Sequence, residues 1–176
     1  MKTRNSFAWM GVVPLLMGAT FAAETPDSQQ ITKLLSDAKT QAFQLKEDAA
    51  TMESFNRMTV SRETQAVMIN QIRDHVNALG RTEVKLKDSE ALAAGWQKQA
   101  INRIVPFLDE LNGYTSAVIE HLNGEVPHTV AEYRDYLEAN ADYSTDLAKM
   151  IADFVDYGRT KDRLERLNTK LEISAR

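Results

Sequence analysis

The histidines and their carboxylate neighbours are the residues with which this chain could hold a metal ion. His121, Glu125 and His128 lie close together in the sequence, and the last two have the Glu-x-x-His spacing found in metal sites of helical bundles. The group falls at a predicted turn, so it is either a divalent-metal site or a polar helix end. His75 lies about 20 Å away, because each helical residue adds about 1.5 Å, and it cannot join this group.

A second set of polar residues is predicted around a proline inside a helix. Pro106 has no amide hydrogen, which leaves the carbonyl oxygen of Asn102 without its helical donor. We expect His75 or Ser144 to satisfy this carbonyl, directly or through water. We also expect Asn140 and Ser144 to form a polar layer that fixes the register of the last helix. The alternative reading of this layer is a small-ligand cavity beside Pro106.

Sequence patterns of catalytic sites are missing from the chain. It has no Gly-x-Ser-x-Gly turn, phosphate-binding glycine loop, His-Glu-x-x-His motif or dinucleotide fingerprint. It has no cysteine, which excludes disulfides, thiolate metal sites and cysteine-linked haem or lipid. Its methionines beyond the N-terminal segment are dispersed, whereas a methionine copper site would need a cluster. We therefore predict that the protein is not an enzyme and carries no cofactor.

The N-terminal segment is interpreted as an export signal. Residues 1–22 start with two basic side chains, continue as an uncharged and mostly apolar run, and end in small residues. Cleavage after Ala22 would leave a single domain, 23–176, in the periplasm or outside the cell. The alternative is a membrane anchor formed by uncleaved residues 5–23, which nearly reach the length of a membrane span.

The net charge argues against nucleic-acid binding. The whole chain has a formal charge of −4, and removal of Lys2 and Arg4 with the signal makes it more negative. A protein that binds nucleic acid non-specifically needs an excess of Lys and Arg to neutralise phosphates. Nucleic acid is therefore not an expected partner.

Apolar residues recur at steps of three and four through the rest of the chain, which predicts an all-α protein. The predicted helices cover about 26–58, 62–87, 89–123 and 128–172. Short loops between amphipathic helices predict an antiparallel up-down-up-down four-helix bundle with a long C-terminal helix.

Capping residues suggest where these helices begin and end. Thr25 is a candidate N-cap before Pro26, Ser61 a candidate N-cap for the second helix, and Asp88 or Ser89 for the third. Gly124 is placed to end the third helix. The boundary near residue 60 rests on Ser61 alone, so one continuous helix through both segments is the alternative.

The last helix has the clearest periodicity in the chain. Its stripe alternates steps of three and four and comprises Val130, Tyr133, Leu137, Asn140, Ser144, Leu147, Ile151, Phe154 and Gly158. The mean step of about 3.5 residues is that of a coiled-coil seam. We therefore expect this stripe to face the other helices.

From about Ser61 to Leu167 the chain resembles a family of uncharacterised exported bacterial helical proteins with no established activity. The residues that carry the resemblance are Ile69 to Asn77, Trp96-Gln97 with Ala100-Ile101, Arg103 and Pro106, Ile119 to Asn123, Tyr136 to Asn140, and Asp153 to Gly158. The resemblance implies a helical fold and export, and it transfers no site.

The C-terminal segment from Arg159 is predicted to project beyond the bundle as a basic amphipathic helix. Its apolar residues are Leu164, Leu167 and Leu171, beside Arg163 and Arg166, and its net charge is positive on an acidic protein. An apolar stripe of this kind needs a cover. Three covers are considered: the start of the first helix (Ile31, Leu34, Leu35), a second copy or another envelope protein, and an anionic membrane surface.

These patterns together predict a non-enzymatic envelope protein. Its helical faces would bind another protein or a second copy of the chain. The competing hypothesis is a bundle that binds a small ligand or a metal near Pro106 or His121.

Overall fold

The described part of the chain is all helical. The computed structural model describes residues 26–58, 60–124 and 130–171. Its α-helices are α1 (Gln29–Ser54), α2 (Arg62–Asp88), α3 (Gly95–Asn123) and α4 (Val130–Lys170), with short 3-10 turns at Phe55–Arg57 and Glu90–Leu92. The described residues contain no strand, in agreement with the predicted fold class.

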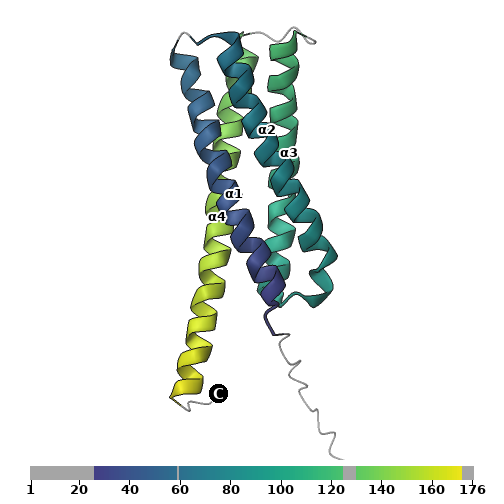
Figure 1. Cartoon of the computed structure of the whole chain (residues 1–176), viewed down its shortest axis with the longest axis vertical. Helices are drawn as coiled ribbons and strands as arrows, with labels where there is room; N and C mark the ends of the chain where they lie inside the picture. Colours follow the sequence, from purple (N-terminus) through teal and green to yellow (C-terminus); the bar gives the residue numbers. More distant parts are fainter. Residues whose placement is uncertain (1–25, 59, 125–129, 172–176) are drawn as a thin grey trace, which may run out of the picture.

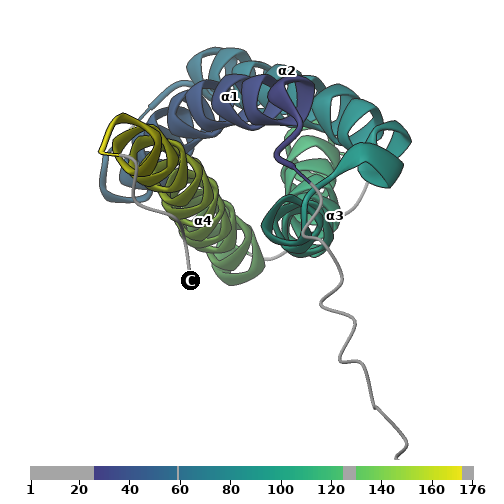
Figure 2. The same cartoon turned by 90° about the horizontal axis from the view of Figure 1, so that it is seen from below.

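The four helices pack side by side as a bundle. Each helix contacts the next one in the chain, and α4 returns to contact α1. The chain direction reverses from each helix to the next (Figure 1). Seen along the bundle, the helices surround a shared interior (Figure 2). Helices in this arrangement can hide one apolar stripe each from water.

The interior is filled by aliphatic side chains from all four helices. Among the largest buried side chains are Ile31, Leu35, Leu45, Met52, Ile72, Leu79, Leu86, Ile101, Ile104, Leu111, Leu137 and Leu147. They repeat at helical spacing along each segment. The burial of this apolar area stabilises the fold in a chain that has no cysteine for cross-linking.

Serine side chains cap the first two helices. Ser61 Oγ accepts from the amide nitrogen of Thr64 at 3.2 Å, so the predicted N-cap of α2 is correct and α1 and α2 are separate helices. Ser28 Oγ accepts from the amide nitrogen of Ile31 at 3.4 Å, and α1 starts at Gln29 rather than at Pro26. The predicted start was wrong because Ser28 is also a good cap, three residues further along.

The start of α3 differs from the prediction because a side chain from within the helix caps it. Helix α3 begins at Gly95 and not near Ser89, after a 3-10 turn. Gln97 Oε1 accepts from the amide of Ala94 at 3.0 Å, which supplies the cap that Ala94 itself cannot. The predicted end is confirmed: Gly124 follows the helix with φ of 74°, in the left-handed region that favours glycine.

The inward stripe of α4 is confirmed along most of its length. Its members from Leu137 to Ile151 are buried, and so is Gly158. Val130 is 68% exposed, so the helix meets the bundle later than predicted. Near the end of the stripe Val155 is buried in place of the predicted Phe154, which is only partly buried. A straight helix has about 3.6 residues per turn, so its buried face shifts gradually relative to a repeat of about 3.5 residues.

The predicted signal segment, 1–22, and the alternative anchor, 5–23, lie outside the described residues. Within the part of the chain that is described, no helix combines the length and the apolar character that crossing a membrane requires.

Candidate interaction surface

Helix α4 is longer than the helices it packs against. It contains 41 residues, against 26 in α1 and 29 in α3, which corresponds to an excess of about 20 Å. Its last turns extend past the first residues of α1 and α3, as predicted, and they project from the end of the molecule (Figure 1). We call residues 159–170 the projecting end of α4.

Apolar side chains recur every seventh residue along α4, beside its inward stripe. This heptad line comprises Tyr136, Tyr143, Met150, Tyr157, Leu164 and Leu171. Sequence reasoning missed it, because the line runs beside the inward stripe and includes aromatic residues that were not counted. The seven-residue spacing was the signal that could have revealed it.

Side chains of α3 cover the first part of the heptad line. The ring of Tyr143 lies 5.8 Å from that of Phe107 and 5.4 Å from that of Tyr114, between ring centroids. Near the start of α3, Trp96 makes an edge-to-face contact with Tyr157 at 5.6 Å. Helix α3 runs in the opposite direction to α4 and begins at Gly95, so it does not cover the heptad line beyond Tyr157.

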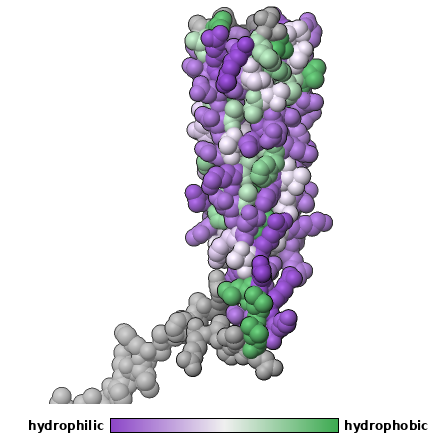
Figure 3. All heavy atoms as spheres, turned by 90° about the vertical axis from the view of Figure 1, so that its left-hand side faces the viewer, coloured by the Kyte–Doolittle hydropathy of each residue, from purple (hydrophilic) through white to green (hydrophobic). Residues whose placement is uncertain are grey.

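The leucines beyond that point are exposed. Leu164 is 57% exposed, Leu167 44% and Leu171 61%. We call these three residues the leucine stripe. Apolar surface is visible at this end of the molecule (Figure 3). The start of α1 does not cover the stripe, because Ile31 and Leu35 are buried in the bundle core. The simplest of the three predicted covers is therefore wrong.

Exposed cations border the leucine stripe on one flank. Successive helical residues are about 100° apart, so the stripe occupies an arc of about 60°. The next arc on one side carries Arg159, Arg163, Arg166 and Lys170, all of them exposed. Asp162 and Glu165 fall further round the helix. A molecule that covers the leucines therefore meets positive charge beside them.

An ion pair attaches the projecting end to the start of α1. Lys161 Nζ lies 2.7 Å from Asp27 Oδ1 and 3.4 Å from Glu165 Oε1. The hydrogen bond that Lys161 donates to Asp27 is the main cause that raises the pKa of Lys161, and the Coulomb attraction of both carboxylates adds to it. Lys161 is therefore paired within the molecule, and Arg159 has a carboxylate neighbour at 3.6 Å in Asp156, whereas no ion pair is found for Arg163, Arg166 or Lys170 among the described residues.

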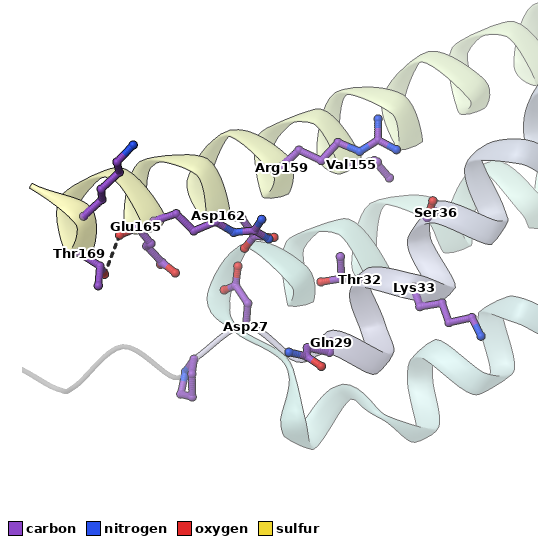
Figure 4. Close-up of a pocket in the computed structure, with 13 residues that line it drawn as sticks. Asp27, Gln29, Thr32, Lys33, Ser36, Val155, Arg159, Asp162, Glu165 and Thr169 are labelled. Carbon is purple, nitrogen blue, oxygen red and sulfur yellow. Dashed lines mark hydrogen bonds between the residues drawn. The ribbon is translucent and has the colours of Figure 1, made fainter.

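A groove lies between the projecting end of α4 and the start of α1, and Arg159, Arg166 and Lys170 of the cationic flank contribute to its lining. Its volume is about 960 Å³, and its walls carry both Arg159 and Arg166 and both Asp162 and Glu165 (Figure 4). Asp27, from the start of α1, points toward α4 in this view. Since opposite charges are mixed along its walls, the groove has no single sign of charge to select an ionic ligand.

Two buried contacts lie at the base of the projection, one between α3 and α4 and one between α3 and the start of α1. A Cβ atom at Gly158 would lie 2.7 Å from Cη2 of Trp96, so only glycine allows this approach. Gln97 Oε1 accepts from the Ser28 amide at 3.1 Å, and its Nε2 donates to the Ser28 carbonyl at 3.0 Å and to Thr32 Oγ1 at 3.1 Å. The start of α3 is thereby fixed to the start of α1.

The predicted metal group cannot be assembled from the described residues. Glu125 and His128 lie outside them. His121 stacks on the ring of Tyr133, with centroids 4.4 Å apart. Across residues 26–58, 60–124 and 130–171, no three His, Asp or Glu side chains are grouped to bind a metal ion.

The predicted polar layer is present in part. Asn140 and Ser144 are buried, and Asn140 Oδ1 accepts from the hydroxyl of Thr115 at 2.9 Å, a partner on α3 that the sequence did not reveal. The hydroxyl of Ser144 donates to the carbonyl of Asn140, as serine in a helix commonly does to the residue four before it. The layer joins α3 to α4.

The predicted direct link from His75 or Ser144 to the carbonyl of Asn102 is not present among the described residues. Ser144 donates to its own helix, and His75 Nε2 lies 3.1 Å from Asp48 Oδ2 on α1. Asn102 and Pro106 are both exposed. Water can therefore serve the carbonyl that the proline leaves without a donor, and no interior side chain is needed.

Comparisons with family models, with curated proteins and with solved structures give no match to this chain. The function must therefore be inferred from the geometry described above.

Proposed function

We propose that this protein is an exported, non-enzymatic binding protein that acts through the projecting end of α4. The observation that carries the proposal is the exposure of the leucine stripe on a helix that is about 20 Å longer than its neighbours. Leucines at helical spacing that no other described residue of the chain covers form a recognition surface for another helical protein or a second copy.

The supports of α4 agree with this function. The glycine at position 158, the double role of Gln97 and the ion pair between Lys161 and Asp27 all lie at the base of the projection. A surface held in one position loses less conformational entropy on binding, so its affinity benefits from this preorganisation. The rest of the bundle then serves as a rigid mount for the projecting end.

Site-specific crosslinking tests the proposal in intact cells of the native host. A photoreactive amino acid in place of Leu167 should give a discrete crosslinked adduct, and the additional substitution Leu164→Asp should remove it. The matched control is the same amino acid in place of Leu92, which is 62% exposed but lies on the 3-10 turn before α3. Absence of an adduct from position 167, or equal adducts from both positions, would refute the proposal.

A further inference from the structure

The heptad line along α4 indicates what kind of molecule covers the leucine stripe. From Tyr143 to Tyr157 the line packs against another helix, α3, through the aromatic contacts of Phe107, Tyr114 and Trp96. Leu164 and Leu171 continue the line at the same spacing after α3 has ended. The uncovered part is thus the continuation of a helix–helix contact that already exists.

The width of the stripe also favours a helix as its cover. Tyr157, Thr160, Leu164, Leu167 and Leu171 alternate steps of three and four, which are the a and d positions of a coiled-coil seam. An a/d seam is narrower than the apolar face of a helix that lies flat in a membrane interface. Three leucines also provide little area for anchoring to lipid.

The charges beside the seam indicate which sign of charge the partner helix should carry. In this register the e and g positions of the projecting end are Lys161, Arg163, Asn168 and Lys170, and none of them is acidic. In an antiparallel pair of two projecting ends, the g positions Arg163 and Lys170 would face each other, so like charges would oppose pairing of two copies. A helix with acidic residues at e and g would meet these cations favourably.

We propose that the partner presents an acidic amphipathic helix, which pairs with α4 from Tyr157 to Leu171 in the place that a longer α3 would occupy. This inference rests on the proposed function and specifies the chemistry of the partner. Its apolar a and d side chains cover the leucine stripe, and its carboxylates pair with Arg163 and Lys170.

Designed peptides of three heptads test the charge preference with the full chain. One peptide has leucine at a and d and glutamate at e and g; a second replaces each glutamate with lysine; a third keeps the glutamates but has serine at a and d. Fluorescence anisotropy should show the first peptide binding at least about tenfold more tightly than either of the others. The serine peptide separates seam pairing from simple charge attraction.

Charge reversal on the protein gives the decisive variant. The double substitution Arg163→Glu and Lys170→Glu should invert the preference, so that the lysine peptide binds better than the glutamate peptide. Both residues are exposed, and circular dichroism should report unchanged helicity. Leu164→Asp should abolish binding of both peptides, whereas Leu92→Asp should not change it.

Four results would overturn the inference: no binding of the glutamate peptide, equal binding of the glutamate and lysine peptides, binding only to anionic phospholipid vesicles, or a concentration-dependent dimer in sedimentation that Leu164→Asp dissociates. The crosslinking test from position 167 does not depend on any of these four results. A crosslinked protein partner without the acidic preference would refute this inference and retain the proposed function.

Discussion

The substitution Gly158→Ala tests how closely α3 and α4 approach each other at the base of the projection. The added Cβ would lie 2.7 Å from Cη2 and 3.0 Å from Cζ2 of Trp96, closer than carbon atoms pack. The indole is nearly buried and is held on one side by Tyr157, so it has little room to move. The overlap must therefore be relieved by shifts of packed groups.

The expected cost comes from two opposing terms. Overpacking of this kind destabilises a core by about 1–3 kcal/mol. Alanine in a helix interior gains about 1 kcal/mol over glycine. The net effect of Gly158→Ala is a loss of stability of up to about 2 kcal/mol. Gly113→Ala is the matched control, because nothing lies within 4 Å of its added Cβ and only the helical gain applies.

Urea unfolding followed by far-ultraviolet circular dichroism measures both variants. We expect the two free energies of unfolding to differ by about 1–3 kcal/mol, with Gly113→Ala the more stable. If Gly158→Ala stabilised the protein as much as Gly113→Ala does, the close contact between Trp96 and α4 would not exist as described.

Three further substitutions or titrations test other contacts. Gln97→Leu should lower the free energy of unfolding by about 2–4 kcal/mol, because it leaves backbone groups at Ser28 and Ala94 without partners. Gln99→Leu, at an exposed position, is the control and should change the free energy of unfolding little. Equal losses in the two variants would contradict the role of Gln97. Burial raises the pKa of Tyr133 to about 12, so its phenol should ionise in an alkaline absorbance titration after the ordinary tyrosines do. Because the raised pKa belongs to the folded state, the stability that Tyr133 contributes is present below pH of about 10 and is lost as the pH rises toward 12; a titration unchanged by Tyr133→Phe in that range would disprove it. Lys161→Met should lower the free energy of unfolding by about 1–3 kcal/mol and speed hydrogen exchange in the projecting end, because Asp27 loses its partner. Lys170→Met should do neither. Equal exchange in both variants would argue against the attachment of the projecting end through Lys161 and Asp27.

Local patterns predicted those features that depend on residues near one another in the sequence. The helix cap at Ser61, the glycine at position 124 and the inward stripe of α4 each involve side chains within one or two turns. Spacing alone reports such neighbours, because helical geometry fixes which residues share a face.

Contacts between distant segments could not be read from spacing. Gln97 bonds to Ser28, 69 positions away, and Lys161 to Asp27, 134 positions away. A buried glutamine looks like any polar residue in a helix until its partners are placed. The same reason explains the error at Pro106: the sequence identified the carbonyl without a donor, but could not tell whether it faced water or the core.

The candidate site was predicted in its residues and missed in its context. The three leucines and their arginines were identified from composition and period, and they are exposed as a group. What the period could not show was that α3 stops at Gly95 and leaves the heptad line uncovered. The same Gln97 side chain that bonds the Ala94 amide at this end also bonds Ser28, 69 positions away, and that tertiary contact cannot be read from spacing.

The absence of cysteine from the chain allows a direct test of whether the leucine stripe is covered in the cell. Leu167→Cys introduces a single thiol, which a maleimide should label rapidly in the purified protein, because position 167 is exposed there. In intact cells of the native host we predict that labelling at this position is at least about tenfold slower, while Leu92→Cys is labelled at similar rates in both samples. Equal labelling of position 167 in cells and in the purified protein would contradict the claim that the projecting end of α4 is a binding surface.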